Sequence, residues 1–143
     1  MRLKKTIIVY IMLVALILST GMAFADGTGT AASETDANRY THVNSANTQL
    51  SISGSTATCK TTVIKTSSSS ANKMVVTNYY YKSSGTYIGS STTTVYNTNN
   101  LFVAKTNKTL NSHGTYYAEA LVKLYHNSQL LESFTLVTGN ATY

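Results

Sequence analysis

Apolar and polar residues alternate with a period of two along most of the chain from residue 39 onward, which is the pattern of β-strands with one buried face. The longest alternating stretch is 112–125, and its apolar side, which should face a core, consists of Tyr116, Ala118, Ala120, Val122 and Leu124. Further strand-like stretches, separated by turns rich in Ser, Asn and Gly, are 39–43, 49–53, 56–65, 73–82, 87–96, 101–104 and 130–138. The pattern predicts an all-β antiparallel sandwich of seven or eight strands, with a small β-barrel as the alternative.

Two of these stretches should form a hairpin. Residues 83–86 read Ser-Ser-Gly-Thr, and a turn with Ser84 and Gly85 at its centre would join 73–82 to 87–96. The second arm, 87–96, is dominated by Ser and Thr and has little to bury. We therefore predict that it is an edge strand.

The first residues have the organisation of a secretory signal peptide. A basic start is followed by an unbroken apolar run at 7–18 and by Ala23-Phe24-Ala25, so cleavage is expected before Asp26. An uncleaved membrane anchor is the alternative, but a spanning helix needs about 20 apolar residues. The predicted organisation is a signal peptide at 1–25, a flexible acidic leader at 26–38 and one β-sandwich domain at 39–143.

The stretch 112–125 begins like strand F of an immunoglobulin domain, where the spacing is Asp-x-Gly-x-Tyr-x-Cys. Gly114 and Tyr116 match it, so Tyr116 is predicted to form a tyrosine corner, while Ser112 and Ala118 replace the Asp and the Cys. The only Cys, Cys59, falls on the inward side of 56–65. Since the partner position holds Ala118, no intradomain disulfide can form. A buried, inert thiol is favoured over a reactive thiol or a dimer link.

Several short motifs extend this likeness beyond one strand. They are Arg-Tyr-Thr-His-Val at 39–43, Leu-Ser-Ile-Ser at 50–53, Ala-Thr-Cys at 57–59, Lys-Ser-Ser-Gly at 82–85 and Gly-Thr-Tyr at 114–116. With them the chain resembles small secreted immunoglobulin-like β-sandwich proteins of Gram-positive bacteria. The resemblance covers most of the expected mature chain, 26–143, and implies a secreted immunoglobulin-like sandwich, but it implies no activity.

Residues that could carry enzymatic chemistry are few. Only Glu119 and Glu132 supply carboxylates after residue 38. The three histidines, His42, His113 and His126, fall at strand ends or turns without metal-ligand spacing. We therefore predict no enzyme, no catalytic residues, no metal and no cofactor.

The folded part of the chain is basic. Eight of the eleven Lys and Arg residues follow Asn38 and are spread along the sequence. Such a charge suits anionic cell-wall polymers, although charge for solubility alone is the favoured interpretation. Export and a single Arg in the folded part argue against nucleic acid, and no stable membrane insertion is expected after cleavage.

The second side of the hairpin formed by 112–125 and 130–138 is also apolar. If Asn127 and Ser128 are the centre of its turn, Leu121 pairs with Phe134, Tyr125 pairs with Leu130, and Lys123 pairs with Glu132. The predicted binding surface consists of Tyr117, Leu121, Tyr125, Leu130 and Phe134. The alternatives are that another segment covers this side or that the register differs.

These observations predict a secreted, non-enzymatic binding or surface-interaction module outside the cell. Tyr and Phe on a sheet face suit a cell-wall glycan or a protein partner, including a second copy of this chain in a homodimer. The alternative is a secreted antimicrobial or toxin-like protein, which small size, basic charge and export would also suit.

Overall fold

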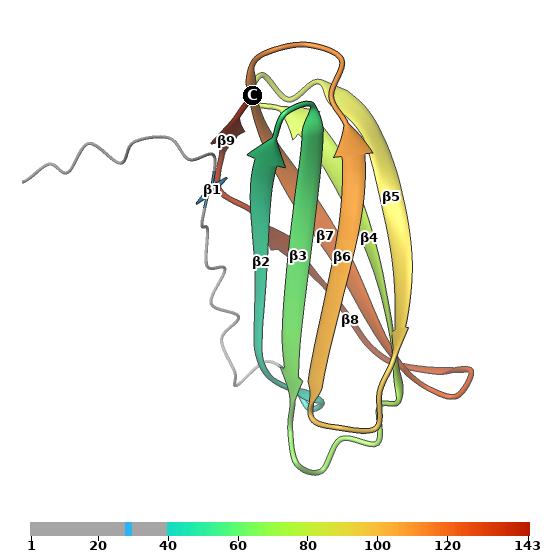
Figure 1. Cartoon of the computed structure of the whole chain (residues 1–143). Coiled ribbons are helices and arrows are strands. Elements are labelled where there is room, and N and C mark those ends of the chain that lie inside the picture. Colours follow the sequence, from blue (N-terminus) through green and yellow to red (C-terminus); the bar gives the residue numbers. More distant parts are fainter. Residues whose placement is uncertain (1–27, 30–39) are drawn as a thin grey trace, which may run out of the picture.

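Two antiparallel β-sheets make up the fold in a computed structural model that describes residues 28–29 and 40–143. The four-stranded sheet has the order β1 (Thr28–Gly29), β2 (Val43–Ser53), β3 (Thr56–Lys65) and β6 (Leu101–Thr109). The five-stranded sheet has the order β5 (Tyr87–Tyr96), β4 (Lys73–Lys82), β7 (Thr115–His126) and β8 (Gln129–Val137), with β9 (Ala141–Thr142) beside β7. The two sheets lie one in front of the other in Figure 1, and the described residues contain no helix.

The strand predictions are confirmed for 56–65, 73–82 and 87–96, whose bounds coincide with β3, β4 and β5. The hairpin between β4 and β5 is also confirmed, with Gly85 at a φ of 87° in its turn, and β5 is an edge strand as predicted. The stretches 39–43 and 49–53 are instead one strand, β2, which begins at Val43 and has a bulge between Val43 and Ser45.

The predicted signal peptide at 1–25 lies outside the described residues. Of the predicted flexible leader at 26–38, the structure describes only Thr28–Gly29, which pairs with Ser51 and Leu50 at the free edge of β2.

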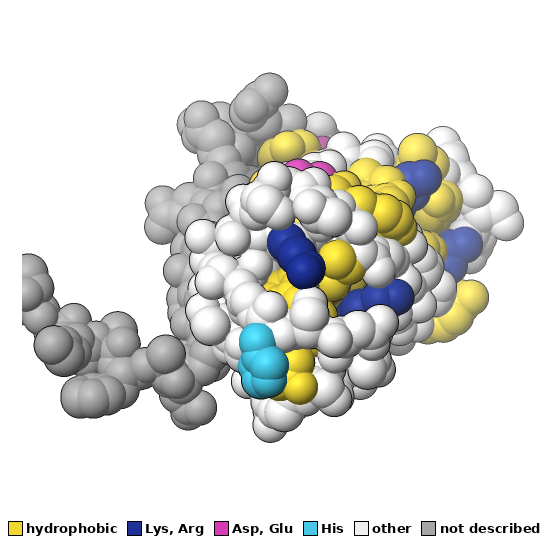
Figure 2. Space-filling view, turned by 90° about the horizontal axis from the view of Figure 1, so that it is seen from above, with side chains coloured by type: hydrophobic (Ala, Val, Ile, Leu, Met, Phe, Trp, Pro, Cys, Tyr) yellow, Lys and Arg dark blue, Asp and Glu magenta, His cyan; other side chains and the backbone are white. Residues whose placement is uncertain are grey.

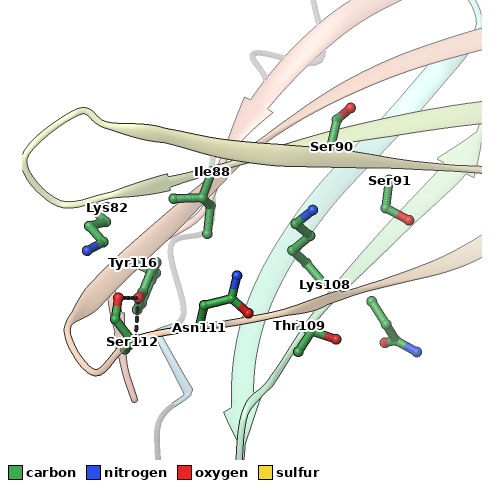
Figure 3. Close-up of a pocket in the computed structure, with 10 residues that line it drawn as sticks. Lys82, Ile88, Ser90, Ser91, Lys108, Thr109, Asn111, Ser112 and Tyr116 are labelled. Atoms are coloured by element: carbon green, nitrogen blue, oxygen red, sulfur yellow. Dashed lines mark hydrogen bonds between the residues drawn. The ribbon is translucent and has the colours of Figure 1, made fainter.

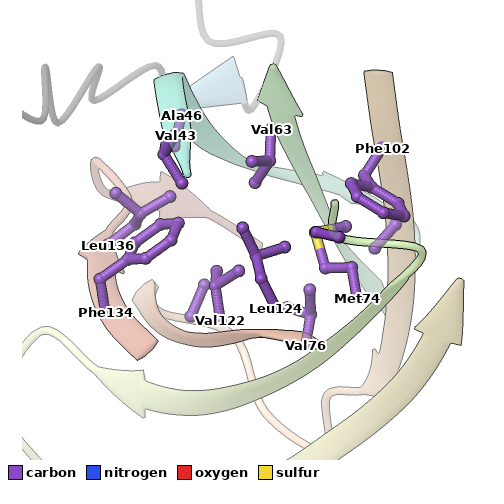
Figure 4. Packing of buried hydrophobic residues seen from close by; sticks show 13 residues of the cluster. Val43, Ala46, Val63, Met74, Val76, Phe102, Val122, Leu124, Phe134 and Leu136 are labelled. Atoms are coloured by element: carbon purple, nitrogen blue, oxygen red, sulfur yellow. The ribbon is translucent and has the colours of Figure 1, made fainter. Parts of the chain in front are cut away.

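The inward faces of the two sheets pack against each other and form two apolar clusters. The larger one, shown in Figure 4, joins Val43, Val63 and Phe102 of the four-stranded sheet to Val122 and Leu124 of β7. The smaller one lies towards the other end of the sandwich and contains Leu50, Ala57, Cys59, Tyr80, Leu110, Tyr116, Ala118 and Ala141. Because the alternation along each strand puts these residues on one side, burial follows directly from the sequence pattern.

A belt of buried polar side chains separates the two clusters. Thr48, Thr61, Asn78 and Thr106 are each at most 4% exposed and occupy inward positions on β2, β3, β4 and β6. Asn78 donates from Nδ2 to Oγ1 of Thr106 over 2.7 Å, and the hydroxyls of Thr48 and Thr61 are 3.0 Å apart. Burying a polar group costs little free energy of folding only when the group has a hydrogen-bond partner, and these side chains have such partners.

Cys59 belongs to this belt, and its predicted burial is confirmed. Its side chain is fully buried, and Sγ donates to Oδ1 of Asn78 on the facing sheet over 3.2 Å. Burial raises the pKa of the Cys59 thiol, against a smaller opposing effect of its Thr48 and Thr61 hydrogen bonds. Both the burial and the raised pKa favour the protonated, shielded thiol, which supports the prediction that Cys59 is unreactive.

Tyr116, the second residue of β7, makes the kind of hydrogen bond that was predicted for it. Its hydroxyl donates to the carbonyl of Ser112, four residues upstream, and lies 3.1 Å from Oγ of the same serine. The ring is 1% exposed and packs in the smaller cluster. This bond ties the connection between β6 and β7 to the start of β7, where the strand pairs with its neighbours.

Candidate binding surface

The register of β7 and β8 differs from the predicted one and removes Phe134 from the predicted surface. Tyr125 pairs with Leu130 as expected, but a bulge next to Tyr125 leaves Leu131 without an opposite residue. Beyond the bulge, Phe134 therefore pairs with Val122 instead of Leu121. Phe134 is 5% exposed and belongs to the core, where its ring lies 5.1 Å from that of Tyr40.

The same bulge corrects the predicted pair of Lys123 and Glu132. Lys123 pairs with Ser133, whereas Glu132 pairs with Leu124, an inward residue. The carboxylate of Glu132 accepts hydrogen bonds from the backbone N–H groups of Thr41 and His42 at 3.1 and 3.0 Å. Its role is to hold the chain that enters β2.

The outward side of the five-stranded sheet carries a surface that we call the tyrosine face. It contains three of the predicted residues on β7, Tyr117, Leu121 and Tyr125, together with Leu130 on β8. The registers of β4 and β5 add further rings to the same side, namely Tyr79, Tyr81, Tyr87 and Tyr96. Tyr87 and Tyr96 are 53% and 76% exposed, so the rings at the β5 edge are open to solvent.

Three rings meet at one end of the tyrosine face, next to the β4–β5 turn. Tyr81 stacks on Tyr117 with centroids 5.2 Å apart and ring planes 15° apart. Tyr87 tilts against Tyr81 with centroids 5.5 Å apart. The three rings come from three adjacent strands and form a continuous aromatic row across the sheet.

The chemical state of this row follows from its surroundings. Loss of hydration beside the neighbouring rings raises the pKa of the Tyr81 hydroxyl, and the Glu119 carboxylate adds a smaller effect in the same direction. Tyr81 therefore stays protonated at neutral pH and can donate a hydrogen bond. A ligand would meet flat apolar rings edged by hydroxyl groups and one carboxylate.

The opposite end of the tyrosine face combines a cation with aromatic rings. Lys73 pairs with Tyr125 on one side and Tyr96 on the other, and its Nζ lies 4.4 Å from the centroid of the Tyr125 ring. Between the two ends, Leu121 lies opposite Thr77, and both side chains are partly buried. Aromatic side chains thus stand at both ends of one sheet face.

The remaining reactive side chains are dispersed. The His126 ring places Nδ1 2.7 Å from the carbonyl of Ser70, and His113 stacks on Tyr143 with centroids 4.2 Å apart. Nδ1 of His42 is buried and has no hydrogen-bond partner among the residues that the structure describes. No three His, Cys, Asp or Glu side chains come together as a metal-binding group within 28–29 and 40–143.

Sequence reasoning missed the contribution of β4 and β5 to the tyrosine face. The signal was present, because Tyr79 and Tyr81 alternate with the buried Tyr80 and must share the side that faces away from the core. Pairing of β4 with β7 was needed to bring these rings beside Tyr117, and the sequence does not state which strands are neighbours.

No protein-family model matches the chain, and no curated protein sequence matches it significantly. In the part of the chain that the structure describes, no helix is long and apolar enough to cross a membrane.

Proposed function

We propose that the protein is a secreted, non-enzymatic binding module that holds a cell-wall glycan on its tyrosine face. The observation that carries the proposal is the row of Tyr87, Tyr81 and Tyr117, which is aligned across three strands and partly open to solvent. The rigid rings can stack on the apolar faces of sugar rings, while their hydroxyls can bond to sugar hydroxyls at small cost in side-chain entropy.

The proposal includes an immunoglobulin-like architecture. The orders β2-β3-β6 and β5-β4-β7-β8 correspond to immunoglobulin strands A-B-E and C′-C-F-G, and the Tyr116 bond to Ser112 corresponds to the corner at the start of strand F. The likeness of 39–43, 57–59 and 114–116 to secreted Gram-positive sandwiches supports the same assignment.

The proposed location is outside the cell, after removal of residues 1–25. The apolar run at 7–18 and the small residues before Asp26 support this location. Protein recovered from the culture medium should begin at Asp26. A product that stays in the cell or keeps residues 7–18 would contradict the secreted part of the proposal.

Retention on insoluble cell-wall glycan tests the binding surface. The double variant Tyr81→Ser and Tyr117→Ser should lower the retained fraction by about tenfold or more, because interface aromatics that anchor a ligand contribute on the order of 2 kcal/mol or more. The matched control is Ile64→Ser with Leu101→Ser, an outward cross-strand pair on the other sheet with exposures of 40% and 46%. This control should bind like the wild-type protein.

Two outcomes would overturn the glycan assignment. Equal retention of both double variants and the wild-type protein would show that the tyrosine face is not the surface that binds. Gel filtration provides the second test: a wild-type dimer that the tyrosine variant converts to monomers would assign the face to contact between two copies. A thermal melt of each variant shows whether lost retention reflects lost folding.

A further inference from the structure

A cavity of about 420 Å³ opens at the end of the sandwich where β4 turns into β5 and β6 leads into β7. Its walls come from β4, β5, β6, the connection after β6, and the ring of Tyr116. In Figure 2, which views the molecule from this end, lysine side chains gather around a hollow that contains apolar side chains. The volume lies within the usual range for small-ligand pockets.

Two lysines line this cavity from opposite sheets. Lys82 of β4 pairs with the buried Tyr116, and Lys108 of β6 pairs with the buried Ala57, so both occupy inward-facing positions. Figure 3 shows Lys108 reaching from β6 towards Ser90 and Ser91 of β5. Inward positions on these strands otherwise hold apolar residues or members of the polar belt, so a lysine on each sheet here is a departure from the pattern.

Gly89 makes room for one of these lysines. Its φ of +137° is one that side chains rarely adopt, and a Cβ at this position would overlap Nζ and Cε of Lys108. The backbone of β5 therefore allows the ammonium group to lie against it.

Another inward lysine, Lys65, has contacts within the protein for its buried ammonium group. Lys65, at the opposite end of β3, is 4% exposed, donates from Nζ to the carbonyl of Ala71 and lies 5.1 Å from the centroid of the Phe102 ring. Burial lowers its pKa. Its ammonium group is thus satisfied by a hydrogen bond to the backbone and a contact with an aromatic ring.

Within residues 28–29 and 40–143, the ammonium groups of Lys82 and Lys108 have no such hydrogen bond or ring contact, and no carboxylate balances their charge. The described residues contain two side-chain carboxylates, and neither lines the cavity: Glu132 binds backbone N–H groups near β2, and Glu119 lies on the tyrosine face. Two like charges on one partly enclosed cavity repel each other, and a bound anion would remove this repulsion.

Among the other lining residues, Ser91, Asn111 and Ser112 supply hydroxyl and amide groups suited to a hydroxylated ligand. Ser90, Asn107 and Thr109 also border the cavity, but they hold outward positions on β5 and β6, where Ser90 lies opposite Tyr79 and Oδ1 of Asn107 accepts a hydrogen bond from Thr58. The tyrosine corner holds Ser112, because the Tyr116 hydroxyl bonds to its carbonyl and lies 3.1 Å from its Oγ. One wall is apolar, formed by Ile88 and the Tyr116 ring.

We propose that this cavity binds a phosphate group carried by a small polyol or sugar, with Lys82 and Lys108 on the phosphate oxygens and the hydroxyl and amide groups on the carrier. Lysine ammonium groups bind phosphate as point charges, and two of them match its charge of up to −2. Planar carboxylates are recognised best by the fork of an arginine, and none of the described residues that line the cavity is an arginine. The site is separate from the glycan contact proposed for the tyrosine face.

Calorimetric titration of the purified protein with glycerol 3-phosphate tests the proposal. Saturable binding is expected, weakened about tenfold or more by Lys82→Gln with Lys108→Gln. The matched control is Lys60→Gln with Lys105→Gln, a cross-strand pair of exposed lysines that removes the same charge from the outer side of β3 and β6. This control should keep the wild-type affinity, and so should Tyr81→Ser with Tyr117→Ser, which separates this site from the proposed glycan site.

The ligand series has defined outcomes. Glycerol should not bind, and inorganic phosphate and glucuronate should bind more weakly than glycerol 3-phosphate. Equal binding of glucuronate would overturn the preference for phosphate, and equal binding of inorganic phosphate would overturn the role of the carrier. If Lys82→Gln with Lys108→Gln does not fold, amide chemical shifts of the wild-type protein decide: changes at Ser90, Asn107 and Ser112 support the site, and changes centred on Lys60 and Lys105 refute it.

Discussion

The outward sides of the two sheets arise from the same alternation and yet present different surfaces. On the four-stranded sheet the outward residues of β3 and β6 are mostly Thr, Lys and Asn, as in Thr58 bonded to Asn107 and Lys60 opposite Lys105. On the five-stranded sheet the equivalent positions of β4 and β7 hold Tyr79, Tyr81, Tyr117 and Tyr125. Strand formation therefore determines only which positions point outward. The residue types at those positions determine whether the sheet presents a hydrated polar surface or an aromatic one.

The outward side of the four-stranded sheet also has a small apolar area, but it differs from the tyrosine face. Ile64, Leu101 and Val103 are 40%, 46% and 39% exposed at one end of β3 and β6. Scattered exposed aliphatic residues are normal on protein surfaces. The tyrosine face differs because its rings stack on one another across three strands.

The largest expected effect tests which residues belong to the tyrosine face. Phe134→Ala should lower the free energy of unfolding by about 3–5 kcal/mol, because it empties a core position. Leu130→Ala, on the other side of the bulge and 49% exposed, should change it by no more than about 0.5 kcal/mol. Denaturant unfolding measures both variants. Similar losses of stability for the two variants would mean that Phe134 lies on the outer surface and that β8 has no bulge.

A moderate effect is expected for the hydrogen bond between Tyr116 and Ser112 at the start of β7. Tyr116→Phe removes the hydrogen bond to Ser112 while keeping the ring, so the loss should be about 1 kcal/mol or somewhat more. Tyr117→Phe, one residue further and outward-facing, is the control and should leave stability nearly unchanged. Equal thermal shifts for the two variants would mean that the corner bond does not order the start of β7.

The smallest effect concerns the hydrated side. Lys60 and Lys105 are directly opposite each other, and like charges in this position destabilise a sheet. Lys60→Glu should therefore raise the free energy of unfolding by roughly 0.2–1 kcal/mol, and the gain should shrink in high salt. Lys60→Gln, which only removes the repulsion, should give a smaller gain. A loss of stability on Lys60→Glu at low salt would contradict the pairing of β3 with β6.

Local sequence signals predicted much of the fold because they act within one strand or turn. The bounds of β3, β4 and β5, the turn at Gly85, the inward thiol of Cys59 and the corner at Tyr116 all follow from alternation and residue type. Features that depend on pairing were missed. The sequence gives no signal for the bulge at Leu131, because Leu130 and Leu131 are the same residue type and either could face the core.

The lysine-lined cavity was missed for the same reason. Lys82 and Lys108 lie 26 positions apart in the sequence, and only the packing of one sheet on the other brings them to one cavity. Likewise Asn78 and Thr106 look like ordinary polar strand residues until the facing sheet supplies their partners. Non-local contacts of this kind are fixed by topology and not by any single stretch of sequence.

The polar belt has a consequence for the conditions in which this chain can fold. In antibody domains a covalent bond between strands B and F joins the two sheets and acts largely by restricting the unfolded chain. Here the sheets are joined through the interior by Cys59 to Asn78 and Asn78 to Thr106, interactions that exist only in the native state. Because neither interaction is a disulfide, a reductant should leave both of them intact.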